Sequence, residues 1–270
     1  MNVGSWLKRA KTRIDSLDAE LILLFVLGER DRSYIITHLE MRISDPDVVL
    51  LNRLVELREQ GMPLAYISGE KEFYGRKFYV NQHVLIPRPD SEVIIDMAKK
   101  LNLGEGAKIL DMGTGSGILA ITLSLEIPRV RVTAADVSKN ALYVASKNAI
   151  ALGGRVDFIQ SDLFSNFPLE EKFDLIVANL PYVDIGWPWR SRELAWEPGQ
   201  ALYSGEGGME LIKKFMEEAV RRADKVILEC DPCQHEEMIK FSKKLKFKHL
   251  ETKGLQLLFT YRGKEKSGKV

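Results

Sequence analysis

A glycine-rich turn follows a short apolar segment near the middle of the chain. The segment Lys108–Met112 leads directly into the run Gly113, Thr114, Gly115, Ser116 and Gly117. Glycine at every second position lets the backbone turn tightly and approach a ligand with no Cβ in the way. In open α/β sheets, ligands bind beyond the carboxyl ends of the strands, where this turn would lie. The pattern indicates a ligand site built largely from main chain.

Acidic residues stand at the ends of three successive predicted strands, at Asp111, Asp136 and Asp162. Asp111 would repel a pyrophosphate, whereas it would attract the cationic sulfonium and ammonium groups of S-adenosylmethionine. Asp136 is placed to accept hydrogen bonds from two ribose hydroxyls. Asp162 is placed to accept from an adenine amino group, with Leu163 packed on the ring. One such acid is equally expected as a helix cap or a solvated loop residue, but three together favour a cofactor site.

The spacing of the glycines separates two candidate cofactors. The run reads G-x-G-x-G, whereas the NAD-binding fingerprint reads G-x-G-x-x-G. Together with the acid at position 111, this spacing favours S-adenosylmethionine over NAD. An NAD-dependent oxidoreductase remains the weaker alternative.

The fourth predicted strand ends at the tetrapeptide Asn179-Leu180-Pro181-Tyr182. An amide nitrogen is a poor nucleophile because its lone pair is delocalised into the carbonyl group. The side-chain oxygen of Asn179 and the carbonyl of Leu180 could hold its two N–H bonds in plane, while Tyr182 offers an aromatic face. We therefore predict Asn179, Pro181 and Tyr182 as catalytic residues, with Asn179 also touching the cofactor and no general base required. The alternative is a proline-containing turn that merely caps a buried strand.

The first 62 residues are predicted to be helical. An apolar stripe between residues 17 and 28 follows a cap at Asp15 or Ser16, and a further helix is predicted over 48–59. The period then changes to that of a β-hairpin over 64–86, turning near Gly75 and Arg76. Beyond two prolines, Asp90 or Ser91 is expected to cap the next helix. Three parts are therefore expected: a helical domain at 1–62, a β-hairpin linker at 63–90 and a larger domain at 91–270.

Strands and helices alternate from about residue 107 onward. Strands are predicted at 108–112, 130–137, 156–160, 173–178, 225–229, 246–252 and 256–262, and helices at 117–126, 139–152, 208–222 and 236–245. Such alternation predicts a mostly parallel sheet covered by helices on both faces. The last two strands, joined by a short turn at Gly254, must pair antiparallel. The predicted fold class is α/β, a Rossmann-like sheet of seven strands with an antiparallel last strand.

Composition excludes several other classes of protein. The formal net charge is +1, which argues against a dedicated nucleic-acid binder. No apolar run reaches the roughly 20 residues that span a membrane, and residues 1–13 lack the apolar core of a secretory signal. Because Cys230 and Cys233 are the only cysteines, a disulfide scaffold is excluded and a cytoplasmic location is expected. No second C-x-x-C and no suitably spaced histidine completes a zinc site, so no metal is expected.

The chain resembles the protein-(glutamine) methyltransferases that modify class I peptide chain release factors. The resemblance extends over nearly the whole chain, and two of its segments are more specific than the glycine loop. These are Leu85-Ile86-Pro87-Arg88-Pro89-Asp90-Ser91-Glu92 and the pattern Glu197-Pro198, Ala201-Leu202, Gly205 and Gly208. Glu229 and Gln234 match a further family motif after the fifth strand.

The resemblance implies a class I S-adenosylmethionine-dependent methyltransferase fold behind a helical domain that recognises the substrate. The acceptor would be the glutamine of the Gly-Gly-Gln tripeptide in a release factor, and S-adenosylhomocysteine would be the second product. The family likeness also assigns Arg88 and Glu197, together with Asn179, Leu180, Pro181 and Tyr182, to substrate binding. Neither a membrane nor a nucleic acid is expected as a partner.

One position departs from the family pattern. The family motif is Asn-Pro-Pro-Tyr, whereas Leu180 stands at its second position here, and Asn-Leu-Pro-Tyr resembles the motif of ribosomal RNA adenine dimethyltransferases. An RNA or DNA adenine N6-methyltransferase is therefore the main alternative, and a non-catalytic module that binds S-adenosylmethionine is another. The segment 184–196, which holds three tryptophans, either grips substrate or packs locally.

Overall fold

The structure, a computed structural model, describes residues 1–188 and 191–263. These residues form two compact units. The first comprises residues 1–70 and 191–196, and the second comprises 71–188 and 197–263. The segment predicted as a hairpin linker, 63–90, is therefore shared between the two units. Trp189 and Arg190, part of the tryptophan-containing segment, lie outside the described residues.

The first unit is helical. Its helices are α1 (Val3–Ala10), α2 (Ser16–Leu27), α3 (Ser33–Thr37), α4 (Asp45–Glu59) and α5 (Leu64–Ser68). Asp15 caps α2, as one of the two predicted caps. Helix α4 begins three residues before the predicted start because Ser44 caps it and Pro46 occupies its first turn. Trp6, Ile22 and Leu51 are among the buried side chains that hold these helices together.

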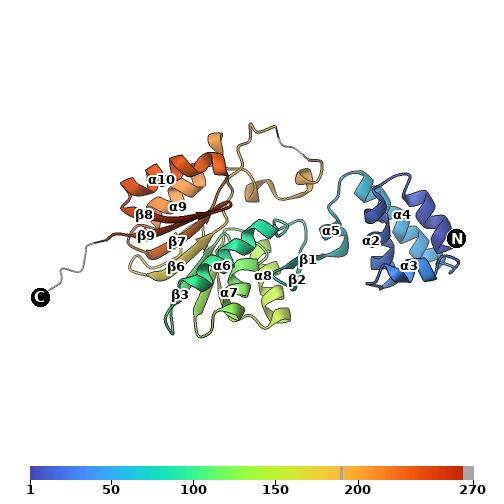
Figure 1. The fold of residues 1–270 in the computed structure, drawn as a ribbon, viewed down its shortest axis with the longest axis horizontal. Coiled ribbons are helices and arrows are strands. Elements are labelled where there is room, and N and C mark those ends of the chain that lie inside the picture. The colour runs from blue at the N-terminus through green and yellow to red at the C-terminus, as the bar shows by residue number, and fades with distance from the viewer. Residues whose placement is uncertain (189–190, 264–270) are drawn as a thin grey trace, which may run out of the picture. The chain divides into compact units, whose positions relative to one another are not determined.

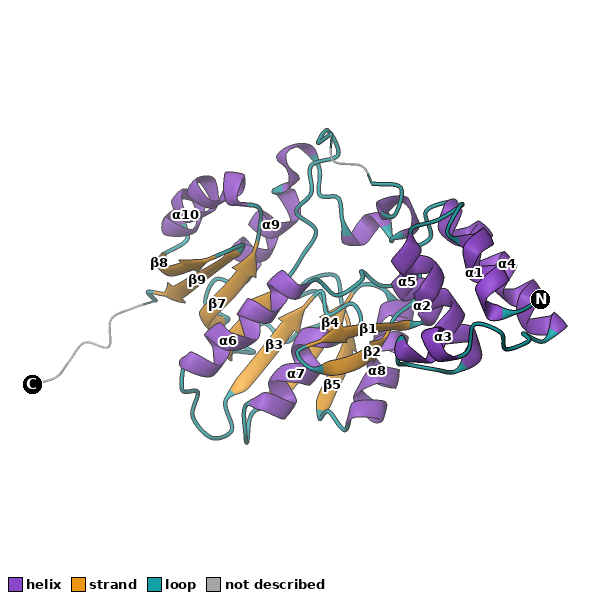
Figure 2. Cartoon of the chain, turned by 45° about the vertical axis from the view of Figure 1, so that its right-hand side comes forward, coloured by secondary structure: helices purple, strands orange, loops and turns teal. Residues whose placement is uncertain are grey.

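A hairpin of strands β1 (Glu70–Phe73) and β2 (Arg76–Tyr79) turns at Tyr74 and Gly75, both with positive φ (Figure 2). The hairpin predicted over 64–86 was wrong at both ends, since residues 64–68 form α5 and residues 84–86 join no strand. Asn81 accepts a hydrogen bond from the backbone N–H of His83 at 3.0 Å, which stabilises a turn after β2. The chain then runs extended into Pro87 without joining a sheet.

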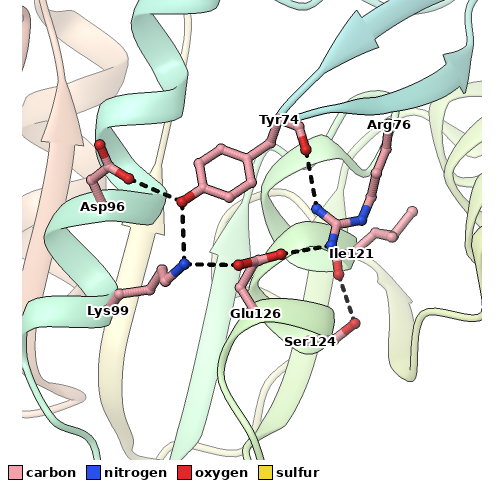
Figure 3. A network of polar contacts seen from close by, with 7 residues as sticks. All are labelled: Tyr74, Arg76, Asp96, Lys99, Ile121, Ser124 and Glu126. Atoms are coloured by element: carbon pink, nitrogen blue, oxygen red, sulfur yellow. Dashed lines mark hydrogen bonds and ion pairs between the residues drawn. The ribbon is translucent and has the colours of Figure 1, made fainter.

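The turn of this hairpin is anchored to two helices of the second unit (Figure 3). Tyr74 donates from its hydroxyl to Asp96 at 3.0 Å, and Lys99 donates to the same hydroxyl at 3.3 Å. Lys99 and Arg76 both donate to Glu126, at 2.8 and 2.6 Å, and these two bonds lower the pKa of that carboxyl. The network joins the hairpin to α6 (Glu92–Lys100) and α7 (Ile118–Glu126).

A seven-stranded sheet forms the centre of the second unit (Figure 1). In spatial order its strands are β5 (Val156–Gln160), β4 (Arg131–Asp136), β3 (Lys108–Met112), β6 (Phe173–Ala178), β7 (Ala223–Glu229), β9 (Gln256–Tyr261) and β8 (Phe247–Lys253). The first five are parallel, and β9 runs antiparallel to both β7 and β8. The predicted fold class is confirmed.

Helices cover both faces of this sheet, because alternate side chains of each strand point to opposite faces. On β3, Ile109 belongs to the core shared with α6 (Glu92–Lys100), α7 (Ile118–Glu126) and α8 (Lys139–Leu152). Its neighbour Leu110 belongs to the opposite core, shared with α9 (Glu210–Glu218) and α10 (His235–Lys244). Within the described residues, no helix is long and apolar enough to cross a membrane.

Helix α9 is shorter than the predicted 208–222. Gly207 and Gly208 adopt φ values of 73° and 67°, which interrupt a right-handed helix before it can start at residue 208. Arg221 has φ of 67° and lies beyond the last helical residue, Glu218. The helical spacing of apolar residues continues past both ends of α9, but the backbone there is not helical.

Candidate active site

A cavity lies at the carboxyl ends of β3, β4 and β6 in the second unit. Most of the predicted site residues line it: Arg88, Gly113, Thr114, Gly115, Ser116, Asp136, Asp162, Leu163, Asn179, Leu180 and Pro181. The predicted site residues that do not line it are Asp111, Gly117, Tyr182 and Glu197. Residues from five separate segments of the chain are thus brought to one place, at the edge of the sheet where parallel folds bind ligands.

The glycine loop is shaped for close approach to a ligand. Gly115 has φ of 54°, and a Cβ added there would meet nothing within 4 Å. Its backbone therefore borders open space in a conformation that side chains disfavour. Gly113 differs: a Cβ added there would lie 2.7 Å from Cδ2 of Leu180. The first glycine makes room for the acceptor segment, and the second leaves room for a ligand.

Asp111 supports the loop from beneath. Its Oδ2 accepts from the hydroxyl of Thr114 at 2.6 Å and from the backbone N–H of Ala120 at 3.1 Å. The side chain is fully buried, and burial raises the pKa of its carboxyl to about 7. Its Oδ1 has no hydrogen-bond partner within the described part of the chain. This aspartate ties the loop to the start of α7.

Asp136 ends β4 and faces the cavity. Its Oδ2 accepts from the backbone N–H of Gly115 and its Oδ1 from that of Ser138, both at 2.9 Å. Burial raises the pKa of this carboxyl, although these backbone bonds oppose the shift. Because a carboxylate has about four lone-pair sites, Asp136 can still accept from a ligand while it holds the loop in place.

Asp162 and Leu163, which follow β5, also line the cavity. The carboxylate of Asp162 is 62% exposed and lies 3.7 Å from Nζ of Lys214. Leu163 is buried and has φ of 46°, a left-handed conformation that is unusual for a leucine. Ser161 holds this turn, since its hydroxyl donates to the carbonyl of Leu163 at 2.6 Å. The strained turn presents an apolar side chain and a carboxylate side by side.

Asn179 follows β6 directly, and its side-chain amide nitrogen donates to the hydroxyl of Ser91 at 2.9 Å. Ser91 in turn donates to Oε2 of Glu229 at 2.8 Å. The expectation that Asp90 or Ser91 caps α6 was therefore wrong, since no side-chain cap bond exists there. The hydroxyl of Ser91 is committed to a buried carboxylate and to Asn179 instead.

The sequence indicates Glu229 only as part of a family motif and does not predict it as a site residue. It also accepts from the hydroxyl of Tyr182 at 3.2 Å, and burial with the nearby carboxylate raises the pKa of that hydroxyl. The carbonyl of Tyr182 accepts from Nε2 of Gln234 at 2.8 Å. The available signal was an acidic residue at the end of a buried strand, beside the strand that carries Asn179.

Arg88 lines the cavity and forms an ion pair with Glu197, with 2.6 Å between Nη2 and Oε1. The side chain of Glu197 is only 1% exposed and also accepts from the backbone N–H of Ile86 at 2.9 Å. It thereby fastens the segment before η1 (Pro89–Ser91) to the segment after residue 196. Arg88 lines the cavity while Glu197 holds it there.

The segment 191–196 packs within the helical unit rather than in the cavity. Glu193 lies 2.6 Å from Arg58, and the indole N–H of Trp196 donates to the carbonyl of Gln60 at 3.4 Å. Residues 191–196 therefore pack locally, which is one of the two alternatives that the sequence left open for this segment. Trp189 and Arg190, which the same prediction included, are not among the described residues.

The two cysteines carry no sign of redox or metal chemistry. Both are free, and Cys230 is buried whereas Cys233 is exposed. Burial raises the pKa of the Cys230 thiol to about 12, and a hydrogen bond with Asp231 raises that of Cys233 to about 11. Such thiols are poor nucleophiles at neutral pH. Among the described residues no group of three or more His, Cys, Asp and Glu side chains is arranged to hold a metal.

Family models of known proteins match both units of the chain, and solved structures align with most of it. The family model described as PrmC N-terminal domain matches residues 4–69, and the model described as Methyltransferase small domain matches residues 90–186. A solved methyltransferase from Pyrococcus furiosus aligns with a TM-score of 0.51 at 22% identity, over 77% of this chain and 98% of that one. The 16S rRNA N2 G1207 methyltransferase of T. thermophilus, solved with AdoMet and guanosine, aligns with a TM-score of 0.53 at 16% identity, over 72% and 50%.

At these identities the solved structures establish the fold alone. Fold and glycine loop together define a class I S-adenosylmethionine-dependent methyltransferase. Two curated relatives are more similar: the release factor glutamine methyltransferase of Koribacter versatilis is 41% identical over 77% of this chain and 75% of its own length. That of Bacillus subtilis is 41% identical over 74% and 72%. The chain belongs to the release factor glutamine methyltransferase family.

Proposed function

We propose that this protein transfers a methyl group from S-adenosylmethionine to the side-chain amide nitrogen of the glutamine in the Gly-Gly-Gln tripeptide of a class I release factor. The observation that carries the proposal is the placement of Asn179. It lines the same cavity as the glycine loop, and its amide nitrogen is already occupied by Ser91. Its carbonyl oxygen is the group left to accept from an amide acceptor.

The cavity fits the cofactor in three respects. Gly115 leaves open space where main chain meets the ligand, Asp136 has acceptor capacity for ribose hydroxyls, and Leu163 offers an apolar surface for the adenine beside Asp162. We assign these residues, with Gly113, Thr114, Ser116 and Gly117 of the same loop, to cofactor binding. Asp111 acts by holding the loop, since its carboxylate bonds to Thr114 and to the start of α7. When bound, the cofactor supplies an electrophilic methyl group and leaves as S-adenosylhomocysteine.

The acceptor side of the cavity needs to orient an amide rather than to deprotonate it. Asn179 accepts one N–H of the substrate amide through Oδ1, and the carbonyl of Leu180 accepts the other. With both N–H bonds held in one plane, the face of the nitrogen is presented to the methyl group. Such alignment is worth up to about 7–11 kcal/mol of barrier. The methylated nitrogen is acidic and loses its proton after transfer, so no general base is assigned.

Pro181 and Tyr182 complete the acceptor side. Pro181 lines the cavity and restricts Leu180 to an extended conformation. Tyr182 does not line the cavity, and its hydroxyl donates to Glu229, which fixes the direction of the aromatic ring. Arg88, which Glu197 holds in place, is proposed to meet the release factor. A cytoplasmic location belongs to the same proposal, because release factors act there.

The test is a methylation assay with labelled S-adenosylmethionine, in which a recombinant class I release factor and total ribosomal RNA are offered in parallel. Label in the release factor supports the proposal. Label in the RNA alone would mean that the Asn-Leu-Pro-Tyr motif serves adenine methylation here. A release factor with the glutamine of Gly-Gly-Gln replaced is the matched control and is expected to take up no label.

A further inference from the structure

Glu229 is a buried carboxylate surrounded by neutral donors. It ends β7 and is 1% exposed. Its Oε2 accepts from the hydroxyl of Ser91 at 2.8 Å and from Nε2 of Gln256 at 2.9 Å, and its Oε1 accepts from the hydroxyl of Tyr182 at 3.2 Å. Burial, and to a lesser degree the nearby Asp90, raise the pKa of this carboxyl, whereas its three hydrogen-bond donors lower it. In its ionised form the carboxylate can only accept hydrogen bonds. Every group that faces it must therefore donate, and this condition determines where each neighbouring proton lies.

The hydroxyl of Ser91 has a single proton, which it uses in its hydrogen bond to Glu229. Toward Asn179, whose Nδ2 lies 2.9 Å away, the oxygen of Ser91 can then act only as an acceptor. The amide of Asn179 must point its NH₂ group at Ser91, which leaves Oδ1 for the cavity that this residue lines. In the flipped orientation, Ser91 would have to donate to Asn179. Two oxygens without a proton between them, on Ser91 and Glu229, would then lie 2.8 Å apart.

The side chain of Gln256 gives independent support for Oε2 of Glu229 as a hydrogen-bond acceptor. Its Nε2 donates both to Glu229 and to the carbonyl of Asp90, at 2.9 and 3.0 Å. Its Oε1 is buried and has no partner among the residues that the structure describes. Such an unpaired oxygen costs about 1–3 kcal/mol. The orientation persists because flipping this amide would set its oxygen against two acceptors.

We infer that Glu229 is a positioning residue for methyl transfer: through the proton of Ser91 it orients the amide of Asn179, so that Oδ1 faces the acceptor nitrogen. The same carboxylate accepts a hydrogen bond from Tyr182. Both ends of the acceptor tetrapeptide are therefore held by one side chain of the neighbouring strand β7. This inference rests on the proposed function, because it assigns Oδ1 of Asn179 to the substrate amide.

The test compares Glu229→Gln, Ser91→Ala and Ser91→Thr with the wild type. An amide at position 229 can donate to Ser91, which frees the serine proton for Asn179 and permits the flipped orientation. Misplacing one orienting group costs about 100-fold in rate, so we expect kcat to fall about 100-fold in Glu229→Gln and in Ser91→Ala. Ser91→Thr keeps the hydroxyl and is expected to retain most of kcat.

The readouts separate positioning from a structural role. The Kd of S-adenosylmethionine by calorimetry and the KM of the release factor are expected to stay close to the wild-type values in all three variants. The Tm of Ser91→Ala is expected to fall, because buried Glu229 and Asn179 each lose a hydrogen bond. Ser242→Ala is the matched control, since it removes another fully buried hydroxyl of the same unit, outside the network. It is expected to keep full kcat.

Wild-type kcat in Glu229→Gln, or in Ser91→Ala, would overturn the inference while leaving the proposed function intact. Equal losses in Ser91→Ala and Ser91→Thr would also overturn it. If Glu229→Gln does not fold, the comparison of the two Ser91 variants decides. If the wild type methylates RNA instead of the release factor, the proposed function fails. The same variants are then compared on that acceptor, where an unchanged kcat overturns the inference and a selective loss supports it.

Discussion

The side chain of Leu180 closes over Gly113. A Cβ added to Gly113 would lie 2.7 Å from Cδ2 of Leu180, and Gly113 itself has φ of 76°. The leucine is buried within the core beneath the site, so it cannot easily move aside. The residue that departs from the family motif is thus accommodated by the first glycine of the cofactor loop. The two halves of the site are in direct contact there.

Replacing this glycine is expected to damage both stability and cofactor binding. The positive φ alone makes Gly113→Ala unfavourable by about 1–2 kcal/mol, and the contact with Leu180 adds to that cost. In the double variant Gly113→Ala/Leu180→Ala the clash is removed while the φ strain remains. Urea unfolding should therefore show less destabilisation in the double variant than the sum of the two single variants. Strict additivity would mean that the two side chains do not compete for this space.

Asp136 is expected to contribute more to cofactor affinity than Asp162. Asp136 is half-buried and also holds the N–H of Gly115, whereas Asp162 is mostly exposed and paired with Lys214. Since hydrogen bonds to a charged group contribute about 1.5–3 kcal/mol, Asp136→Ala should weaken the binding of S-adenosylmethionine about 10- to 100-fold. Calorimetry with Asp162→Ala as the comparison checks this order. A variant at 136 with wild-type affinity would refute the assignment.

The buried carboxyl of Asp111 should leave a pH signature in stability. Burial raises its pKa from 3.8 to about 7 on folding, so the native state binds a proton more tightly than the unfolded chain. Its contribution is therefore greatest below pH 3.8 and is lost as the pH rises toward about 7. Asp111→Asn removes this titration while an amide oxygen remains to accept.

The measurement for this prediction is the free energy of unfolding of both proteins at several pH values. Between about pH 4 and pH 7, the wild type is expected to lose stability relative to Asp111→Asn. A constant difference across that interval would show that the carboxyl does not titrate there. The comparison with the variant is needed because other carboxylates of the protein change stability in the same interval.

Asn179 should be required for turnover and largely dispensable for cofactor binding. Asn179→Ala removes the acceptor for the substrate amide, and we expect kcat to fall at least about 100-fold with little change in the Kd of S-adenosylmethionine. Asn179→Asp is the informative companion variant, because a carboxylate keeps an acceptor but cannot donate to Ser91. It should be nearly as impaired as the alanine variant. Turnover at the wild-type rate in Asn179→Ala would remove this residue from the mechanism.

Local sequence patterns predict the limits of a helix or strand correctly where that element has clear end signals and a regular apolar period. Helix α8 and strands β5 and β6 have the predicted limits, and Ser138 and Gly153 close the two ends of that helix. The glycine loop and most of the predicted cavity residues also lie together, because the carboxyl ends of neighbouring parallel strands meet at one edge.

Partners distant in the sequence were not predictable in this way. Ser91 has the local signature of a helix cap, but Glu229 lies 138 positions away and takes its hydroxyl. Asp111 is a second example. Its position at the end of a strand predicts a contact with the ligand, but its carboxylate accepts from Thr114 of the glycine loop instead. Residues 191–196 belong with the helical unit although they follow the acceptor segment in the chain. Each of these relationships depends on tertiary contacts that periodicity and capping do not encode.

The most direct test of the account is peptide mass spectrometry of a class I release factor after incubation with S-adenosylmethionine and either the wild type or Asn179→Ala. The account predicts one added methyl group on the Gly-Gly-Gln peptide, located at the side-chain nitrogen of glutamine, with the wild type only. A methyl group on any other residue, or the same modification from Asn179→Ala at the wild-type rate, would contradict it.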